Sequence, residues 1–149
     1  MSMTVCDYNY DLAIREVGKQ AEVTNNLGRT ALYGEIVYLD GIYGIVMEHA
    51  GIANDAKGRI AMLDSDIIVS TAQITATDTF GVGRPIYFLA GGSSAAGTLE
   101  DSAASGAVAI GTITAEQGSA GAMTAISFRP YSQIVDYGGY NTRLTAVEA

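Results

Sequence analysis

Two β-branched and aromatic runs joined by Asp-Gly constrain this chain more than any other feature. The runs are Tyr33–Leu39 and Ile42–Met47, both rich in Ile, Val and Tyr, and Asp40-Gly41 separates them. Both central residues of a type I′ turn need positive φ, which Asp tolerates and Gly adopts freely. The sequence therefore predicts a β-hairpin that turns at Asp40-Gly41.

Further strand candidates follow at a spacing typical of all-β domains. They are Arg59–Leu63, Asp66–Thr71, Pro85–Leu89, Ala107–Ala115 and Ala122–Arg129. Turn-rich clusters separate them at residues 51–58, 77–83, 91–97 and 116–121. Short strands at such spacing predict a mainly β fold, a compact β-barrel or β-sandwich, rather than a βαβ fold.

The chain divides by composition into three zones. Residues 1–32 are expected to form an extended N-terminal arm, because Asp7–Leu27 fits neither a helical nor a strand period well, with a short strand at Leu12–Val17. Residues 33–130 hold the strand candidates and are expected to form the β-rich domain. Residues 131–149 are polar, carry Gly and Tyr, and are expected to form a C-terminal tail.

Two of the strand candidates indicate which side chains are buried. Period-2 alternation in Ala122–Arg129 places one set inward, namely Thr124, Ile126 and Phe128. In Ala107–Ala115, the face opposite Val108 and Ile110 carries only Ala and Gly at its first positions. Such a face permits close approach of another backbone, either within this chain or from a second subunit.

The charge balance excludes several classes of partner. The chain has 16 acidic and 8 basic residues, a net charge of −8. Nucleic acids and anionic lipids repel such a chain, so neither is expected as a partner. Charged residues make up only 16%, so small neutral side chains or other protein chains are expected to cover much of the surface. Without a signal peptide or an apolar membrane span, we expect synthesis in the cytoplasm.

Side chains that bind metals or act as bases are scarce. Cys6 and His49 are the only thiol and imidazole, so one chain cannot assemble a Cys/His metal site. A serine triad would depend on His49, for which an exposed position in a turn is favoured. Asp64-Ser65-Asp66 could offer two carboxylates to a cation, but it lacks the glycine and the bidentate Glu of a calcium loop. A turn at the start of a strand is favoured there.

Two glycine-containing segments resemble catalytic or nucleotide motifs only in part. Gly81-Val82-Gly83-Arg84-Pro85 lacks the third glycine and the helix of a dinucleotide site, and Pro85 predicts a bend into a strand. Arg84 is a candidate for a bidentate contact with a carboxylate of this or another chain. Gly118-Ser119-Ala120-Gly121 lacks the G-x-S-x-G spacing of a nucleophile elbow. We expect no catalytic residue, cofactor or metal, and no enzyme.

Tyrosine is the main aromatic residue, with nine copies against three Phe and no Trp. Tyr is enriched at protein interfaces because it combines a large contact area with a polar tip. Five of the nine lie in the two terminal zones. Together with Arg84 they are the candidate interface residues: Tyr8, Tyr10, Tyr131, Tyr137 and Tyr140. The alternative, that these rings fold back onto the chain's own domain, stays open.

An ordered series of short features covers residues 30–130. Its members are Gly34–Tyr38, Ile42–Val46, Gly81–Phe88, Gly97–Leu99, Ala107–Ile113 and a last strand that ends at Phe128. In this order the series resembles the capsid decoration (cement) proteins of tailed bacteriophages, a family formerly described only as a domain of unknown function. The order of the pieces carries the resemblance rather than any one motif.

The resemblance implies a β-rich structural protein that forms small oligomers, most often trimers, on the outer surface of a phage head. It implies binding to the major capsid protein, bridging of its subunits and capsid stabilisation, after synthesis in the cytoplasm of the host bacterium. The arm before residue 33 and the tail after Pro130 depart from the family pattern, so the mode of attachment is not carried over. The alternatives are a tail-tube or head-completion protein and a carbohydrate-binding module.

Overall fold

The computed structural model describes residues 19–103, 106–132 and 134 of the chain. Its strands form two antiparallel sheets, which confirms the expected mainly β class. The chain divides into two compact units. The first contains the described residues up to 67 together with 92–96, and the second contains the described residues of 68–91 and those after 96.

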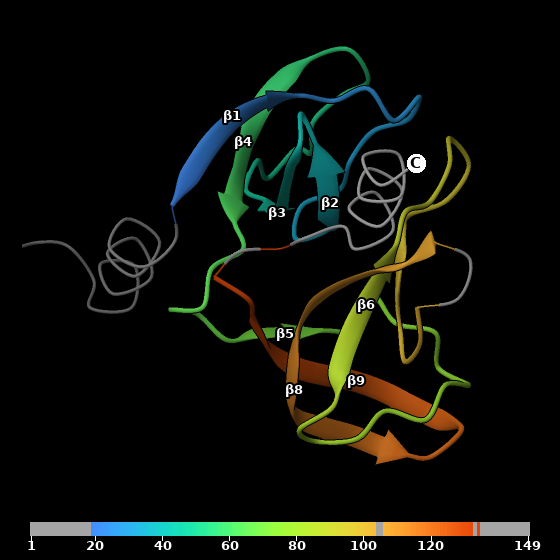
Figure 1. Ribbon diagram of the computed structural model, residues 1–149. Helices are drawn as coiled ribbons and strands as arrows, with labels where there is room; N and C mark the ends of the chain where they lie inside the picture. Colours follow the sequence, from blue (N-terminus) through green and yellow to red (C-terminus); the bar gives the residue numbers. More distant parts are fainter. Residues whose placement is uncertain (1–18, 104–105, 133, 135–149) are drawn as a thin grey trace, which may run out of the picture. The chain divides into compact units, whose positions relative to one another are not determined.

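The sheet of the first unit has the strand order β1-β4-β3-β2 (Figure 1). Its strands are β1 (Gln20–Thr24), β2 (Ile36–Leu39), β3 (Ile42–Val46) and β4 (Lys57–Met62). One cluster of buried apolar side chains forms the core of this unit: Val23, Ala31, Val37, Leu39, Val46, Ile52 and Ile60. Burial of such side chains supplies the main stabilisation of the unit.

The hairpin at Asp40-Gly41 is confirmed. Asp40 has φ 52° and Gly41 has φ 78°, the positive values that a type I′ turn requires. Tyr38 lies opposite Tyr43 across the two strands. The predicted start at Tyr33 is wrong, because β2 begins only at Ile36 and the residues before it form a separate turn.

The second unit contains a sheet with the order β5-β9-β8-β6-β7. The strands are β5 (Val69–Thr71), β6 (Pro85–Leu89), β7 (Thr98–Glu100), β8 (Val108–Ser119) and β9 (Ala122–Pro130). Its buried apolar side chains include Phe80, Ile86, Phe88, Leu99, Ile110, Ile113, Ile126 and Phe128. The predicted strand Pro85–Leu89 is confirmed at both ends.

Several strand boundaries differ from the prediction. β1 and β7 were not predicted as strands; β1 lies in the zone expected as an arm and pairs with β4. β8 continues through residues 116–119, where a turn was expected, because β9 supplies ladder partners that local composition does not reveal. The predicted strand Leu12–Val17 lies outside the described residues, and the division at residues 32 and 130 stays a prediction.

The alternation predicted for β9 is right at Ile126 and Phe128 and wrong at Thr124, which is exposed. The register with β8 shifts there: Gln117 lies opposite Ala125, but the next residue of β8 lies opposite Met123. Thr124 is therefore an extra residue in the ladder, and its hydroxyl donates to the Gln117 carbonyl at 3.2 Å. This bulge reverses the inside and outside positions toward the end of the hairpin.

The close approach predicted for the small face of β8 occurs within the chain at Gly111. A Cβ added to Gly111 would lie 2.5 Å from the carbonyl oxygen of Arg129 and 2.8 Å from the ring of Phe128. No real Cβ tolerates such distances, so glycine is required where β8 meets β9. At this position the neighbouring backbone belongs to this chain's own sheet.

Candidate interaction surfaces

Four of the candidate interface residues, Tyr8, Tyr10, Tyr137 and Tyr140, lie outside the described residues. The fifth tyrosine, Tyr131, follows β9 directly and is half-buried. Its backbone N–H donates to the Ile110 carbonyl at 2.9 Å, which extends the pairing of β9 with β8. An intermolecular role for these tyrosines stays a prediction.

Arg84 lies in the second unit, in the bend before β6. The N–H of Arg84 donates to the Gly81 carbonyl at 3.1 Å, and its own carbonyl accepts the N–H of Ile113 at 2.8 Å. Gly83 has φ 88° and Pro85 opens β6, as the bend interpretation requires. The side chain is exposed, and no carboxylate of the described residues forms an ion pair with it. A contact with another chain therefore stays a prediction.

Of the residues that could have supplied a catalytic or metal site, the structure describes His49, Asp64 and Asp66, and Cys6 lies outside the described residues. His49 is exposed in a turn, as favoured from the sequence. The carboxylate of Asp64 accepts the N–H of Asp66 at 3.1 Å and pairs with the Lys19 ammonium at 3.2 Å, so both aspartates belong to a turn after β4. Within residues 19–103, 106–132 and 134, no three His, Cys, Asp or Glu side chains gather to hold a metal ion.

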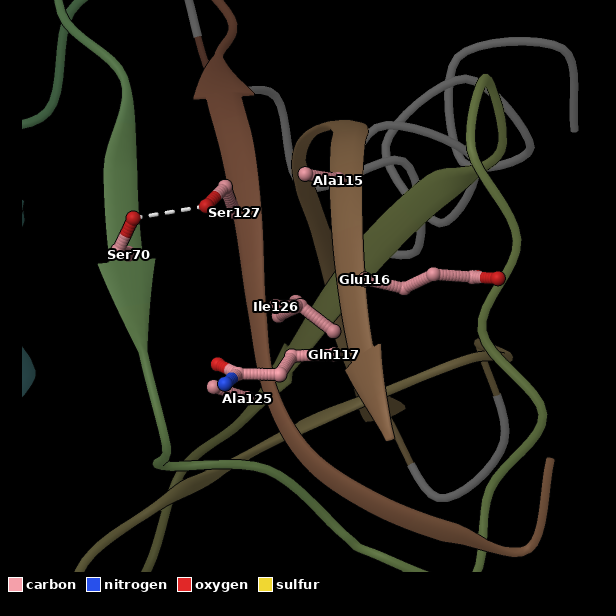
Figure 2. A pocket seen from close by; sticks show the side chains of 7 residues that line it. All are labelled: Ser70, Ala115, Glu116, Gln117, Ala125, Ile126 and Ser127. Atoms are coloured by element: carbon pink, nitrogen blue, oxygen red, sulfur yellow. Dashed lines mark hydrogen bonds between the residues drawn. The ribbon is translucent and has the colours of Figure 1, made fainter. Parts of the chain in front are cut away.

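A shallow depression of about 300 Å³ lies on the sheet of the second unit. Figure 2 shows that Ser70 of β5 and Ser127 of β9 face each other, with their hydroxyl oxygens 2.7 Å apart. A serine nucleophile needs a base within hydrogen-bond reach, but Ser70 is paired with another hydroxyl. The other lining residues are Ala115, Glu116, Gln117, Ala125 and Ile126. Glu116 supplies the one carboxylate among the residues that line this depression.

Large apolar side chains are exposed on both units. In the first unit Leu32 is 63% exposed, and Tyr33 and Tyr38 are each 45% exposed. In the second unit the exposed side chains of this kind are Ile68 and Val82, the latter at 62%. Leu32 and Tyr33 are adjacent in sequence, and both are exposed. Exposed apolar side chains mark contacts with other proteins where they form a contiguous patch.

Leu32 and Tyr33 belong to a turn that we call the Leu32–Glu35 turn. The N–H of Glu35 donates to the Leu32 carbonyl at 3.0 Å. Gly34 has φ 82°, which the third position of a type II turn requires. The ring of Tyr33 stacks on the imidazole of His49, with centroids 4.5 Å apart and planes 16° apart. One of the two exposed side chains of the turn, Tyr33, thus packs against the segment that contains His49.

A largely buried ion pair supports this turn. The Arg29 guanidinium donates to both carboxylate oxygens of Glu35, at 3.0 and 2.6 Å. The same carboxylate accepts the N–H of Leu32 at 3.0 Å, and Arg29 also donates to the carbonyls of Thr30 and Gly92. Bidentate charge-assisted bonds of this kind fix geometry more firmly than neutral ones. Glu35 therefore ties the turn to the loop that precedes it.

Tyr38 contributes a separate aromatic pair on the hairpin of β2 and β3. Its ring lies 4.3 Å from that of Tyr43, with the planes tilted by 37°. The two residues are direct cross-strand partners, and such aromatic pairs stabilise sheets. Tyr38 therefore has a role within the hairpin, where its ring packs against that of Tyr43.

The sequence interpretation missed the Leu32–Glu35 turn. Tyr33 was assigned to a strand, and the ion pair joins residues that are six positions apart, a spacing with no regular meaning in helix or strand. Gly34 was the available signal, since a glycine after Tyr fits a type II turn.

Acidification is expected to destabilise the first unit through two carboxylates. Donation from the backbone N–H of Arg59 lowers the pKa of Glu48, and donation from the backbone N–H of Asp66 and from Lys19 lowers the pKa of Asp64. Below the usual pKa of each group the unfolded chain binds more protons, so the stabilisation present at neutral pH is lost as pH falls through the lowered pKa. In urea unfolding, the wild type should lose more stability between pH 7 and pH 3 than a Glu48→Gln/Asp64→Asn variant. Equal losses would contradict this assignment.

Comparison with known protein families, with curated proteins and with solved structures finds no match to this chain. Among the residues that the structure describes, none form a helix that is long and apolar enough to cross a membrane.

Proposed function

We propose that this chain is a structural virion protein that binds the outer surface of a phage capsid and stabilises it by bridging major capsid protein subunits. The observation that carries the proposal is the Leu32–Glu35 turn, which exposes Leu32 and Tyr33 on a backbone fixed by hydrogen bonds. Exposure of adjacent large apolar side chains is unfavourable in water and favourable in contact with protein. The resemblance of residues 30–130 to capsid decoration proteins supports the same role.

The charge of the chain agrees with a position outside the shell. A net charge of −8 repels packaged DNA and keeps the free protein soluble. The charged fraction of 16% leaves much surface that can be covered by other subunits with little cost of charge desolvation. Partners of the proposed complex are the major capsid protein and further copies of this chain, with a homotrimer as the proposed oligomer.

To bridge the capsid, one oligomer of this chain must contact several major capsid protein subunits at once. A symmetric oligomer presents the same surface several times, so each contact can be weak while the assembly binds tightly. Candidate contacts beyond the Leu32–Glu35 turn are Arg84 and the terminal tyrosines: Tyr8, Tyr10, Tyr131, Tyr137 and Tyr140.

Binding to undecorated mature phage heads tests this function. We expect the purified chain to co-sediment with heads and to saturate at a fixed number of copies per capsid. Failure to sediment with any head at concentrations well above micromolar would contradict the proposal. Assembly into free rings, or a hexameric mass, would instead favour a tail-tube protein.

A further inference from the structure

The loop that joins β6 to β7 packs within the first unit. β6 ends at Leu89 and β7 begins at Thr98, and these two residues pair across the strands. Residues 90–97 therefore form the loop of the β6–β7 hairpin. Within this loop, residues 92–96 belong to the first compact unit, whereas both strands of the hairpin belong to the second. We call residues 92–96 the strap.

The strap meets the first unit at Gly28 and Arg29. The Nε of Arg29 donates to the Gly92 carbonyl at 3.3 Å. A Cβ added to Gly28 would lie 2.9 Å from the Cβ of Ser93, closer than real Cβ atoms come, so glycine is what leaves room for the strap. The N–H of Gly28 also donates to the side-chain oxygen of Asn54 at 2.8 Å. The backbone on which the strap rests is thus itself held by hydrogen bonds.

Little free energy holds the strap closed. Its sequence is Gly-Ser-Ser-Ala-Ala, and all of these residues are exposed, so closure buries little apolar surface. The hydrogen bond from Arg29 is longer than the about 2.9–3.0 Å that is typical of N–H···O bonds. A chain rich in Gly and Ser also regains conformational freedom when it leaves a surface. The closed and open positions of the strap are therefore expected to be close in free energy.

The end of the loop that follows the strap is fixed independently of the first unit. Gly97 is buried, and a Cβ there would lie 2.6 Å from the ring of Phe88, so glycine is required for this close approach to β6. The side-chain amide of Gln73 donates to the Gly97 carbonyl at 3.0 Å. Opening of the strap therefore breaks its contacts with the first unit and leaves the pairing of β6 with β7 intact.

We propose that residues 92–96 act as a strap that closes on the first unit and opens while both sheets stay folded. When closed, the strap covers Gly28 and gives the Arg29 guanidinium an acceptor besides Thr30 and Glu35. When open, it leaves the ion pair of Arg29 with Glu35 in place and exposes the backbone of the loop to solvent. This inference goes beyond the proposed function, because it concerns the free chain and does not depend on what the chain binds.

Limited proteolysis of the purified chain measures the opening, because a protease cuts a loop mainly in conformers in which the loop is free. The probe is pancreatic elastase, which cuts after small side chains, and mass spectrometry of the fragments gives the initial rate of cleavage within residues 90–97. Gly28→Ala should hold the strap open, because the added Cβ meets Ser93. Gly34→Ala is the matched control: Gly34 has φ 82° and Gly28 has φ 83°, so alanine strains both backbones alike. Apart from chain neighbours, no atom lies within 4 Å of a Cβ at Gly34.

We expect cleavage within residues 90–97 to be about tenfold faster in Gly28→Ala than in the wild type, and to stay within about twofold in Gly34→Ala. Gly28→Ala/Ser93→Gly removes the collision and should be cleaved at the rate of Ser93→Gly alone. Equal rates for folded Gly28→Ala and Gly34→Ala would overturn the inference.

A second pair of variants keeps Gly28 unchanged, in case circular dichroism shows that Gly28→Ala does not fold. Ser93→Val enlarges the side chain that faces Gly28, whereas Ser94→Val adds the same side chain at the next position of the strap. We expect faster cleavage within residues 90–97 in Ser93→Val than in Ser94→Val. Equal rates for these two variants would likewise overturn the inference.

Discussion

Replacing Glu35 with alanine is expected to lower the free energy of unfolding of the first unit by about 3–5 kcal/mol. The side chains of Arg29 and Glu35 are only 16% and 6% exposed. Removal of the carboxylate leaves the guanidinium largely buried without its charge partner and leaves the N–H of Leu32 without its acceptor. Urea unfolding followed by circular dichroism measures the loss. Hydrogen exchange is expected to locate it in residues 19–67.

Two further variants separate the cost of an unpaired charge from the value of the pair. Arg59→Ala removes a partner from the largely exposed ion pair with Glu48 and should cost less than about 1 kcal/mol. Arg29→Met/Glu35→Leu removes both buried charges and should cost less than Glu35→Ala alone. A Glu35→Ala variant as stable as the wild type would show that this pair does not hold the turn.

Asn25→Ala is expected to have the second largest effect, about 3 kcal/mol. Asn25 is fully buried, and its side-chain amide donates to the carbonyls of Arg29 and Ile52 at 2.8 and 2.7 Å. Its side-chain oxygen accepts the N–H of Leu27 at 2.9 Å. Alanine satisfies none of these backbone groups, so the loop between β1 and the Leu32–Glu35 turn loses its internal support.

Asn54→Ala provides the matched control for Asn25→Ala. Asn54 is exposed, and its side-chain oxygen accepts the N–H of Gly28 at 2.8 Å. Water can replace an exposed hydrogen bond, so we expect this substitution to cost less than about 1 kcal/mol. Equal effects of the two substitutions in urea unfolding would contradict the role given to Asn25.

Local sequence signals predicted the hairpin at Asp40-Gly41 and the start of β6, and they failed where the pairing partner is distant in sequence. Asp40-Gly41 specifies its own turn geometry, and Pro85 marks the start of a strand, so both were predicted correctly. β1 is a strand because β4 lies beside it, and Thr124 is exposed because of a shift in the register with β8. Neither cause can be read from the few residues around the position concerned.

The candidate site was harder to predict for the same physical reason. The exposure of Leu32 depends on where the chain turns. The turn in turn depends on the ion pair between Arg29 and Glu35, whose spacing of six residues matches neither a helical nor a strand period. The stack of Tyr33 on His49 joins residues from two turns that the β-hairpin brings together. From the sequence, interface tyrosines were expected at the two chain ends. The described structure shows exposed tyrosines at other places, namely Tyr33 before the first hairpin and Tyr38 within it.

Stability and proposed binding are linked through these residues. Arg29, Glu35 and Asn25 hold the backbone, and that backbone presents Leu32 and Tyr33. A substitution in the supporting set should therefore weaken head binding along with stability, whereas a substitution of Leu32 or Tyr33 should weaken binding alone. This difference distinguishes the side chains proposed to contact the head from the residues that hold their backbone.

Electron cryo-microscopy of mature phage heads with and without the bound chain tests the decoration role. We expect added density on the outer capsid surface, in contact with two or more major capsid protein subunits, and heads that release their DNA only at a higher temperature. A decoration role would be contradicted if heads incubated with an excess of the chain showed no added outer density. It would also be contradicted if the added density were confined to the tail or to the head–tail junction.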